Sequence, residues 1–219
     1  MSADDKQKLI ESLLPYITQN KQEKIFEVIK NRTHYITVAL EDIFQSHNAS
    51  AVLRTCDIFG VQNVHVIESK NKFTANPSVA MGASKWVNVT HHDTTINAFK
   101  ALKNQGYRIV ATTPHTDSYY LPTLPLDQKT ALIFGNEQTG LSSIAMEHAD
   151  MFVKIPMYGF VESFNISVSV ALCLYDIITR LHQSSYAWKL TQEEQQELML
   201  TWIKKISKTA HMLADKNND

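Results

Sequence analysis

The sequence predicts an α/β protein in which a mainly parallel sheet carries helices on both faces, with helical extensions at both ends. Two observations indicate this class. Apolar, β-rich runs alternate along the chain with segments of helical periodicity. Several of these runs are continuously apolar, as expected for strands covered on both faces. The length of 219 residues, 44% of them hydrophobic, suits one folded α/β domain with helical additions.

The N-terminal stretch is expected to form two short helices. Apolar positions lie three and four residues apart over Asp5–Leu14 and again over Gln22–Ile29, and Pro15 separates the two segments. The two helices are expected to form an appendage and not a separate domain. The chain is therefore predicted to divide into three parts: a helical N-terminal extension (1–33), an α/β domain (34–182) and a helical C-terminal extension (183–219).

The first half of the α/β domain begins with a strand at Tyr35–Leu40. A helix is expected from Asn48, a favourable N-cap residue, to Phe59, with Gly60 as its terminator. Alternating patterns and a helical face closed by Gly106 indicate two more strands and one more helix: Val64–Glu68, Trp86–Thr90 and Thr95–Asn104.

The second half continues the alternation with strands that are apolar throughout. The expected strands are Tyr107–Thr113, Thr130–Phe134 and Met151–Ile155. The expected helices are Ser143–His148, the long apolar Ile166–Leu181 and the amphipathic Gln192–Met212.

Composition excludes several classes of protein. The N-terminus, MSADDKQK, is polar and has no apolar signal-peptide core behind it. The most apolar helical run, Val168–Ile178, contains Asp176 and is shorter than the roughly 20 residues that span a bilayer. Cys56 and Cys173 suit reduced thiols of a cytoplasmic protein, and no CxxC pair or histidine spacing indicates a metal site. No membrane partner is expected.

The net charge of −1 does not by itself indicate a nucleic-acid-binding protein. The distribution of the basic residues is more informative, because they gather in three clusters. Each cluster could be solvated surface or could contact phosphates. The members are Lys70, Lys72 and Lys85; Lys21, Lys24, Lys30 and Arg32; and Lys204, Lys205 and Lys208.

Three polar segments, each fused to an apolar run, lie where a strand should give way to a helix. They read NASAVLR (48–54), GNEQTGLS (135–142) and IPMYGFVESFNISVS (155–169). In this order they resemble the three motifs of the SpoU branch of the SPOUT methyltransferases, and the resemblance runs from about Val38 to Leu181. These enzymes move a methyl group from S-adenosylmethionine to a ribose 2′-hydroxyl of RNA. Within the branch, the chain is most similar to enzymes that act on guanosine 18 of tRNA.

The resemblance implies further properties. It implies a deep trefoil knot in the C-terminal half and a homodimer whose active sites take residues from both subunits. It implies tRNA, not DNA, as the partner. It also implies that S-adenosylmethionine lies bent among three loops, near Thr112, Gly135, Ile155 and Phe164. There is no GxGxxG sequence, so dinucleotide binding has little support.

The resemblance casts five residues in catalytic roles: Arg54, Asn48, Glu137, Ser163 and Asn165. It casts Arg54 as the catalytic arginine, sometimes proposed as the base. Since a guanidinium stays protonated above about pH 12, Arg54 is better suited to stabilise the developing alkoxide and to bind a phosphate than to act as the base. Simpler interpretations are a surface pair of Arg54 with Asp57, and Asn48 as an N-cap only. Glu137 could be an exposed acid of a loop, and Ser163 and Asn165 could be helix-start residues only.

Two departures from the family pattern bear on RNA affinity. Gln138 stands where relatives often have lysine, and Glu162 stands where they often have glutamine. Neither position is assigned to the chemistry. The alternatives to a tRNA methyltransferase are the same reaction on ribosomal RNA or at another tRNA position, and a knotted RNA-binding protein that has lost catalysis.

Overall fold

The computed structural model describes residues 2–73, 82–114, 118–207 and 212. The chain forms two compact units. The larger unit is His34–Trp188, and the smaller one combines Met1–Thr33 with Lys189–Asp219. The two ends of the chain thus belong to the same unit.

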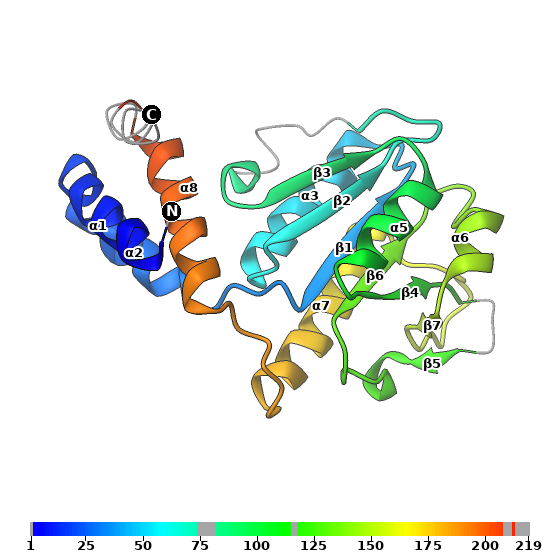
Figure 1. Cartoon of the computed structure of the whole chain (residues 1–219). Helices are drawn as coiled ribbons and strands as arrows, with labels where there is room; N and C mark the ends of the chain where they lie inside the picture. Colours follow the sequence, from blue (N-terminus) through cyan, green and yellow to red (C-terminus); the bar gives the residue numbers. More distant parts are fainter. Residues whose placement is uncertain (1, 74–81, 115–117, 208–211, 213–219) are drawn as a thin grey trace. The chain divides into compact units, whose positions relative to one another are not determined.

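The larger unit is built on one seven-stranded sheet with the order β3-β2-β1-β6-β4-β7-β5 (Figure 1). All the strand pairings found in it are parallel. Strands β1 and β6 lie in the interior of the sheet and are buried along their whole length, as predicted for strands covered on both faces. The strands are β1 (Ile36–Glu41), β2 (Asn63–Ile67), β3 (Asn88–His92), β4 (Arg108–Thr112), β5 (Tyr119–Tyr120), β6 (Thr130–Phe134) and β7 (Met151–Lys154).

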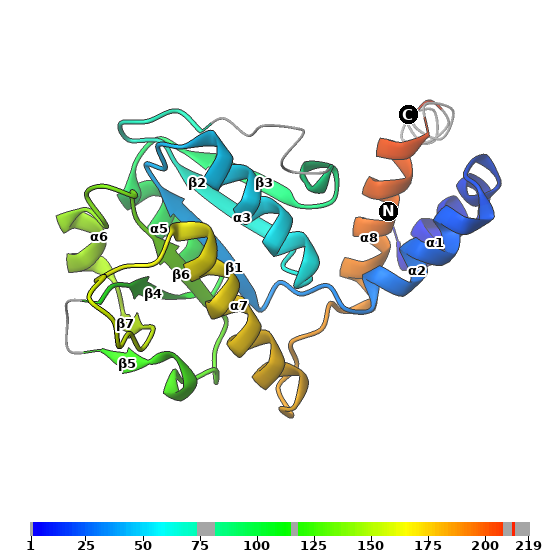
Figure 2. The same ribbon diagram turned by 180° about the vertical axis from the view of Figure 1, so that it is seen from behind.

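Helices cover both faces of this sheet. Helices α3 (Ser46–Ile58) and α7 (Ile166–His182) lie on one face (Figure 2), and they share a core with alternate residues of the strands, such as Val38 and Leu40 of β1. Helices α5 (Thr95–Asn104) and α6 (Ser143–His148) form a second core on the other face, together with strand residues such as Ala39 of β1. The predicted fold class is confirmed. The trefoil knot stays a prediction.

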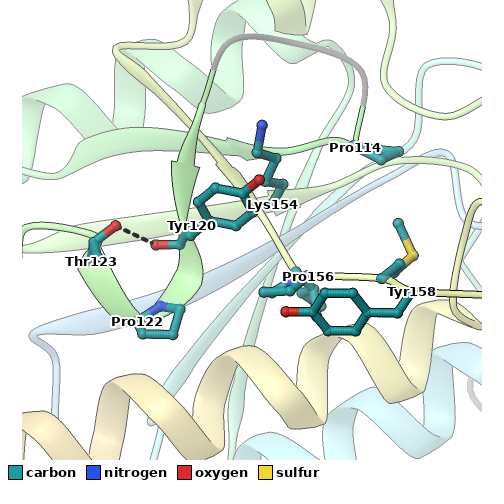
Figure 3. A pocket seen from close by; sticks show the side chains of 9 residues that line it. Pro114, Tyr120, Pro122, Thr123, Lys154, Pro156 and Tyr158 are labelled. Carbon is teal, nitrogen blue, oxygen red and sulfur yellow. Dashed lines mark hydrogen bonds between the residues drawn. The ribbon is translucent and has the colours of Figure 1, made fainter.

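Strand β5 was not predicted. It has only two residues, too few for an alternating pattern, and its pairing with β7 holds it at the edge of the sheet. The short 3₁₀-helix η3 (Leu121–Thr123) follows, and the Thr123 hydroxyl donates to the Tyr120 carbonyl at 2.9 Å (Figure 3). A further 3₁₀-helix, η2 (Ala83–Lys85), precedes β3.

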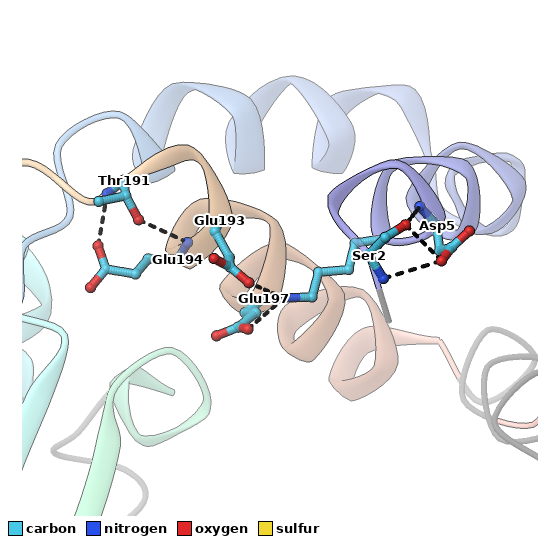
Figure 4. A network of polar contacts seen from close by, with 7 residues as sticks. Ser2, Asp5, Thr191, Glu193, Glu194 and Glu197 are labelled. Carbon is cyan, nitrogen blue, oxygen red and sulfur yellow. Dashed lines mark hydrogen bonds and ion pairs between the residues drawn. The ribbon is translucent and has the colours of Figure 1, made fainter.

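The smaller unit contains α1 (Ala3–Leu13), the 3₁₀-helix η1 (Leu14–Tyr16), α2 (Gln19–Ile29) and α8 (Gln192–Ile206). The ammonium of Lys6 on α1 pairs with Glu193 at 2.9 Å and with Glu197 at 2.6 Å on α8 (Figure 4). Capping boxes open both α1 and α8. The predicted helix Gln192–Met212 is too long, because α8 ends at Ile206 and Ser207 is extended. Residues 208–211 lie outside the described residues.

Arg32 corrects one prediction for this unit. Its side chain is buried, with only 2% of its surface exposed, and its guanidinium lies 5.2 Å from the centre of the Trp202 ring. A buried guanidinium over an aromatic face stabilises the unit and does not reach solvent. Arg32 therefore does not belong with the lysines as a candidate phosphate contact. None of the helices in the described ranges is long and apolar enough to cross a membrane.

Candidate active site

A cavity of about 680 Å³ opens at the carboxyl ends of β4, β6 and β7. Segments that follow these three strands line it, together with residues 162–166 and part of α7. Because the strands are parallel, their carboxyl ends meet at one edge of the sheet, which is where open α/β sheets bind ligands. The cavity is the candidate active site.

The turn after β6 fixes one wall of the cavity. Asn136 and Gly140 exchange backbone hydrogen bonds of 3.0 and 2.9 Å, and the Asn136 side-chain oxygen accepts from the backbone of Gln138 and Thr139. A Cβ on Gly135 would lie 2.3 Å from the Gly140 backbone, so glycine is required there. Gly140 itself has a φ of 69°. This rigid turn presents the Glu137 side chain.

The carboxylate of Glu137 lies at the N-terminus of α3. It accepts hydrogen bonds from the backbone of Phe44 at 3.0 Å and Gln45 at 3.3 Å, and from the Asn48 amide at 2.8 Å. Burial alone would raise the pKa of Glu137, but these hydrogen bonds, led by that of Asn48, outweigh it and hold the pKa below its usual value. Glu137 is therefore an anion at neutral pH, favoured by the helix dipole.

Asn48 is a bridge between motifs and not an N-cap, which corrects the sequence prediction. Helix α3 begins at Ser46, so Asn48 stands at its third position, 2% exposed. Its amide nitrogen donates to Glu137, and its oxygen accepts from the Asn165 amide at 3.1 Å. The backbone N–H groups at the start of α3 donate to Glu137, which is remote in sequence, and not to the side chain of a neighbouring N-cap residue.

Asn165 completes this network from the third motif. It is the N-cap of α7, where its side-chain oxygen accepts from the Ser167 backbone at 2.9 Å and from the Ser167 hydroxyl at 2.6 Å. Glu137, Asn48 and Asn165 thus form one continuous chain of hydrogen bonds through all three motifs. Ser163 is exposed and lines the same cavity.

The four residues expected near the methyl donor all line this cavity: Thr112, Gly135, Ile155 and Phe164. The Thr112 hydroxyl donates to the Ile133 carbonyl at 2.8 Å and so ties β4 to β6. Cys173 also reaches the cavity, but burial, assisted by Asp176, raises the pKa of its thiol to about 12. A thiol with this pKa stays protonated and is not a nucleophile at neutral pH.

Arg54 is the one candidate site residue that does not line the cavity with the other candidates. It is exposed on α3 and is absent from the cavity lining. Among the described residues, no hydrogen bond or ion pair engages its guanidinium. On the same face of the sheet, α7 exposes a stripe of apolar side chains at helical spacing: Val168 (43% exposed), Leu172 (37%) and Tyr175 (64%).

Asp42 organises the site and was missed by the sequence reasoning. It follows β1 with a φ of 52°, unusual for a residue other than glycine. Its carboxylate accepts from the backbone of Lys70 at 2.6 Å and Asn71 at 3.1 Å, and its carbonyl accepts from the Asn136 amide at 2.7 Å. Asp42 therefore joins the lysine-bearing segment to the turn that carries Glu137. An aspartate after a strand is too common for its sequence to reveal this.

The fold and cavity define a parallel α/β protein that binds a ligand at the carboxyl edge of its sheet. Residues 35–175 match the family model described as SpoU rRNA Methylase, and the chain belongs to that family. It is 44% identical over 215 residues to a tRNA (guanosine(18)-2′-O)-methyltransferase of Borreliella burgdorferi, covering 98% of this chain and 99% of that relative.

Solved structures agree with this assignment. The crystal structure of the Aquifex aeolicus TrmH/SpoU tRNA modifying enzyme superposes with a TM-score of 0.75 at 31% identity, covering 84% of this chain and 95% of that one. The SpoU methyltransferase AviRb from Streptomyces viridochromogenes, in complex with the cofactor AdoMet, gives a TM-score of 0.64 at 21% identity, covering 72% and 65%. At this identity the second likeness supports the fold alone.

Proposed function

We propose that this protein transfers the methyl group of S-adenosylmethionine to the ribose 2′-hydroxyl of guanosine 18 in tRNA, in the cytoplasm. One observation carries the proposal. The hydrogen-bonded chain of Glu137, Asn48 and Asn165 joins three motifs, far apart in sequence, around one cavity. The near full-length similarity to a relative named for this reaction supports the choice of tRNA and nucleotide.

The methyl donor is proposed to lie in the cavity, among Thr112, Gly135, Ile155 and Phe164. The lack of a side chain at Gly135 lets the Gly140 backbone pack directly against it, and this fixes the turn that lines the cavity. The family model that matches residues 35–175 is one of methylases, which fits this choice of donor. When bound, S-adenosylmethionine supplies the methyl group, and the surrounding residues bind and orient it.

Glu137 is proposed to act as a positioning residue and not as the base. Hydrogen bonds from Phe44, Gln45 and Asn48 already occupy its oxygens, and its pKa is held low. A weak base whose oxygens are engaged is poorly suited to take a proton from a ribose hydroxyl. It holds the start of α3, and through Asn48 it orients Asn165 at the cavity.

Arg54 is proposed to stabilise the developing alkoxide and the adjacent phosphate, serving the cavity of a second subunit. A guanidinium remains charged at neutral pH and donates to both groups without changing protonation. Its absence from the residues that line the cavity of its own chain supports a shared site. So does the exposed stripe of Val168, Leu172 and Tyr175, since burying a large apolar side chain contributes about 1.5–3 kcal/mol.

A mixed dimer tests the shared site. Arg54→Ala subunits are combined with Asn165→Ala subunits, and each homodimer is expected to be inactive. In the heterodimer both lesions fall into one composite site, leaving one working site with about half the activity of the wild-type dimer. Verified heterodimers without activity would mean that each subunit carries a complete site of its own.

RNA is proposed to contact Lys70 and Lys72. Both are exposed, and Asp42 fixes the backbone of the segment that bears them. Their ammonium groups can meet phosphates as that segment approaches the turn of Glu137. RNA binding by such contacts weakens steeply with salt, whatever the net charge of the protein.

The activity itself is tested with purified protein, labelled S-adenosylmethionine and unmodified transcripts. A tRNA transcript is expected to take up one methyl group, and a matched transcript with 2′-deoxyguanosine at position 18 none. Ribosomal RNA fragments serve as the second substrate. Equal labelling of the deoxy transcript, or methylation of the ribosomal fragment alone, would refute the proposed target.

A further inference from the structure

A second hollow adjoins the donor cavity. It has a volume of about 470 Å³ and lies around the ends of β5 and β7. Four residues line both cavities: Pro114, Lys154, Ile155 and Met157. A molecule bound in the hollow would therefore lie directly beside the methyl donor.

Aromatic rings and one cation dominate the walls of the hollow. Tyr120 and Lys154 are paired neighbours in the sheet, and the Lys154 ammonium lies 4.7 Å from the centre of the Tyr120 ring. Figure 3 shows Lys154 beside that ring, and the ring of Tyr158 beside Pro156. Tyr120 is 53% exposed and Tyr158 is 97% exposed. No acidic residue is among the described residues that line the hollow.

The Tyr120 wall is held in place before anything binds. The Arg180 guanidinium on α7 donates to the carbonyls of Leu121 at 3.0 Å and Leu124 at 2.8 Å, and Asp176 holds Arg180 at 2.8 Å. Thr123 donates to the Tyr120 carbonyl. Both ends of η3 are thus fixed to α7 or to their own turn. A wall that is already ordered loses little conformational entropy on binding.

The two tyrosine rings and the Lys154 ammonium together suit a nucleotide as the bound molecule. Exposed tyrosine faces stack on nucleobases without regard to sequence, and an ammonium meets the phosphate that joins one nucleotide to the next. A purely apolar segment of a second chain would not need the Lys154 charge, which desolvation would then penalise. The described lining residues carry one positive charge, that of Lys154, and no carboxylate, which suits an anion.

We propose that the hollow is a subsite for a nucleotide of the RNA substrate close to the methylated one, with Tyr120 and Tyr158 stacking its base and Lys154 contacting its phosphate. The inference rests on the proposed function, since it presumes an RNA substrate. It adds residues outside the family motifs and gives them a task in substrate recognition. The subsite holds the chain so that the target ribose reaches the donor.

The test measures RNA and donor binding separately. Variants Tyr120→Leu, Tyr158→Leu and Lys154→Met are titrated with fluorescent tRNA in the presence of S-adenosylhomocysteine, and their affinity for S-adenosylmethionine is measured without RNA. Each tyrosine replacement is expected to weaken tRNA binding about tenfold, with donor affinity within twofold of wild type. Phenylalanine, which keeps the ring, is expected to restore tRNA affinity at both positions.

Lys154 has a matched control in this chain. The Lys129 ammonium also lies over a tyrosine ring, 5.7 Å from the centre of Tyr107, but Lys129 is outside both cavities. Lys154→Met is expected to lower the slope of log affinity against log salt by about one, whereas Lys129→Met leaves the slope unchanged. Equal slopes in the two variants would refute the phosphate contact.

Three results would overturn the subsite. These are wild-type tRNA affinity in both leucine variants, a loss of donor affinity as large as the loss of tRNA affinity, or a change in oligomeric state as the sole effect. The last two would assign the hollow to the donor or to a second copy of the chain. If the wild-type protein methylates tRNA and the variants bind tRNA with wild-type affinity, the subsite is refuted and the proposed function is not. Wild-type protein that neither binds nor methylates tRNA refutes the proposed function as well.

Discussion

Replacing Glu137 by glutamine tests the network that joins the three motifs. Three donors, the backbone of Phe44 and Gln45 and the Asn48 amide, share two carboxylate oxygens in the structure. A glutamine side chain offers one oxygen and turns its NH₂ group toward a donor, so at least one hydrogen bond is lost and one contact becomes repulsive. Since a hydrogen bond to a charged group contributes about 1.5–3 kcal/mol, the unfolding free energy should fall by about 2 kcal/mol.

The assay is urea unfolding of Glu137→Gln beside Glu162→Gln at pH 7.5. Glu162 is a matched control, because it is exposed and lines the same cavity, and its replacement should change stability by less than about 0.5 kcal/mol. As the pKa of Glu137 is lowered in the folded state, its stabilisation is present above its unfolded pKa. It is lost as the pH falls through its folded pKa, and the variant should lack that part of the acid dependence. Equal stability of the two variants would refute the network.

Three further predictions concern single groups. Arg54→Ala should reduce single-turnover methyl transfer at least a hundredfold with donor affinity within a few-fold; activity within tenfold of wild type, under about 1.4 kcal/mol of barrier, would reject its catalytic role. Burial and the neighbouring His92 lower the pKa of His65 from 6.5 to about 4. As the pH falls, His65 is therefore protonated in the unfolded chain at a higher pH than in the folded protein. The wild-type unfolding free energy should therefore decline by up to about 3 kcal/mol between pH 6.5 and pH 4, and His65→Gln, followed by urea unfolding across that range, should show a flatter decline. Replacing Lys70 and Lys72 by methionine should lower the salt slope of tRNA binding by about two, and an unchanged slope would show that both lysines are only solvated.

The sequence predicted the layers of the fold well, because regular elements follow from local patterns. The bounds of α5, α6 and β6 agree with the predicted ranges residue for residue. The core positions expected for the two cysteines are also confirmed, as both are buried. Such features depend on periodicity and burial, which neighbouring residues determine.

The predictions that failed depend on partners far along the chain. Asn48 was expected to cap its own helix, but Glu137 holds the helix start, and Asn48 is free to bridge to Asn165. Arg32 was grouped with surface lysines, but it packs on Trp202. Local propensity cannot predict either contact, because each pairs residues that only the tertiary fold brings together.

The sequence was enough to predict which motifs form the candidate site, but not which contacts their side chains make. The strand-to-helix positions of the three segments indicated one edge of the sheet, and the cavity gathers all the candidates except Arg54. The role of Asp42 required its φ of 52° and three tertiary hydrogen bonds, none of which a single sequence carries.

The most direct test of the proposed function is a map of methylated riboses in tRNA from three strains. These carry the wild-type gene, a deletion of it, or the deletion complemented with the Arg54→Ala variant. Mass spectrometry of nuclease fragments should find 2′-O-methylguanosine at position 18 in the wild-type strain and lose it in the other two, with every other methylated ribose unchanged. Full methylation of guanosine 18 in the deletion strain, or loss of a different methylated ribose, would contradict the account.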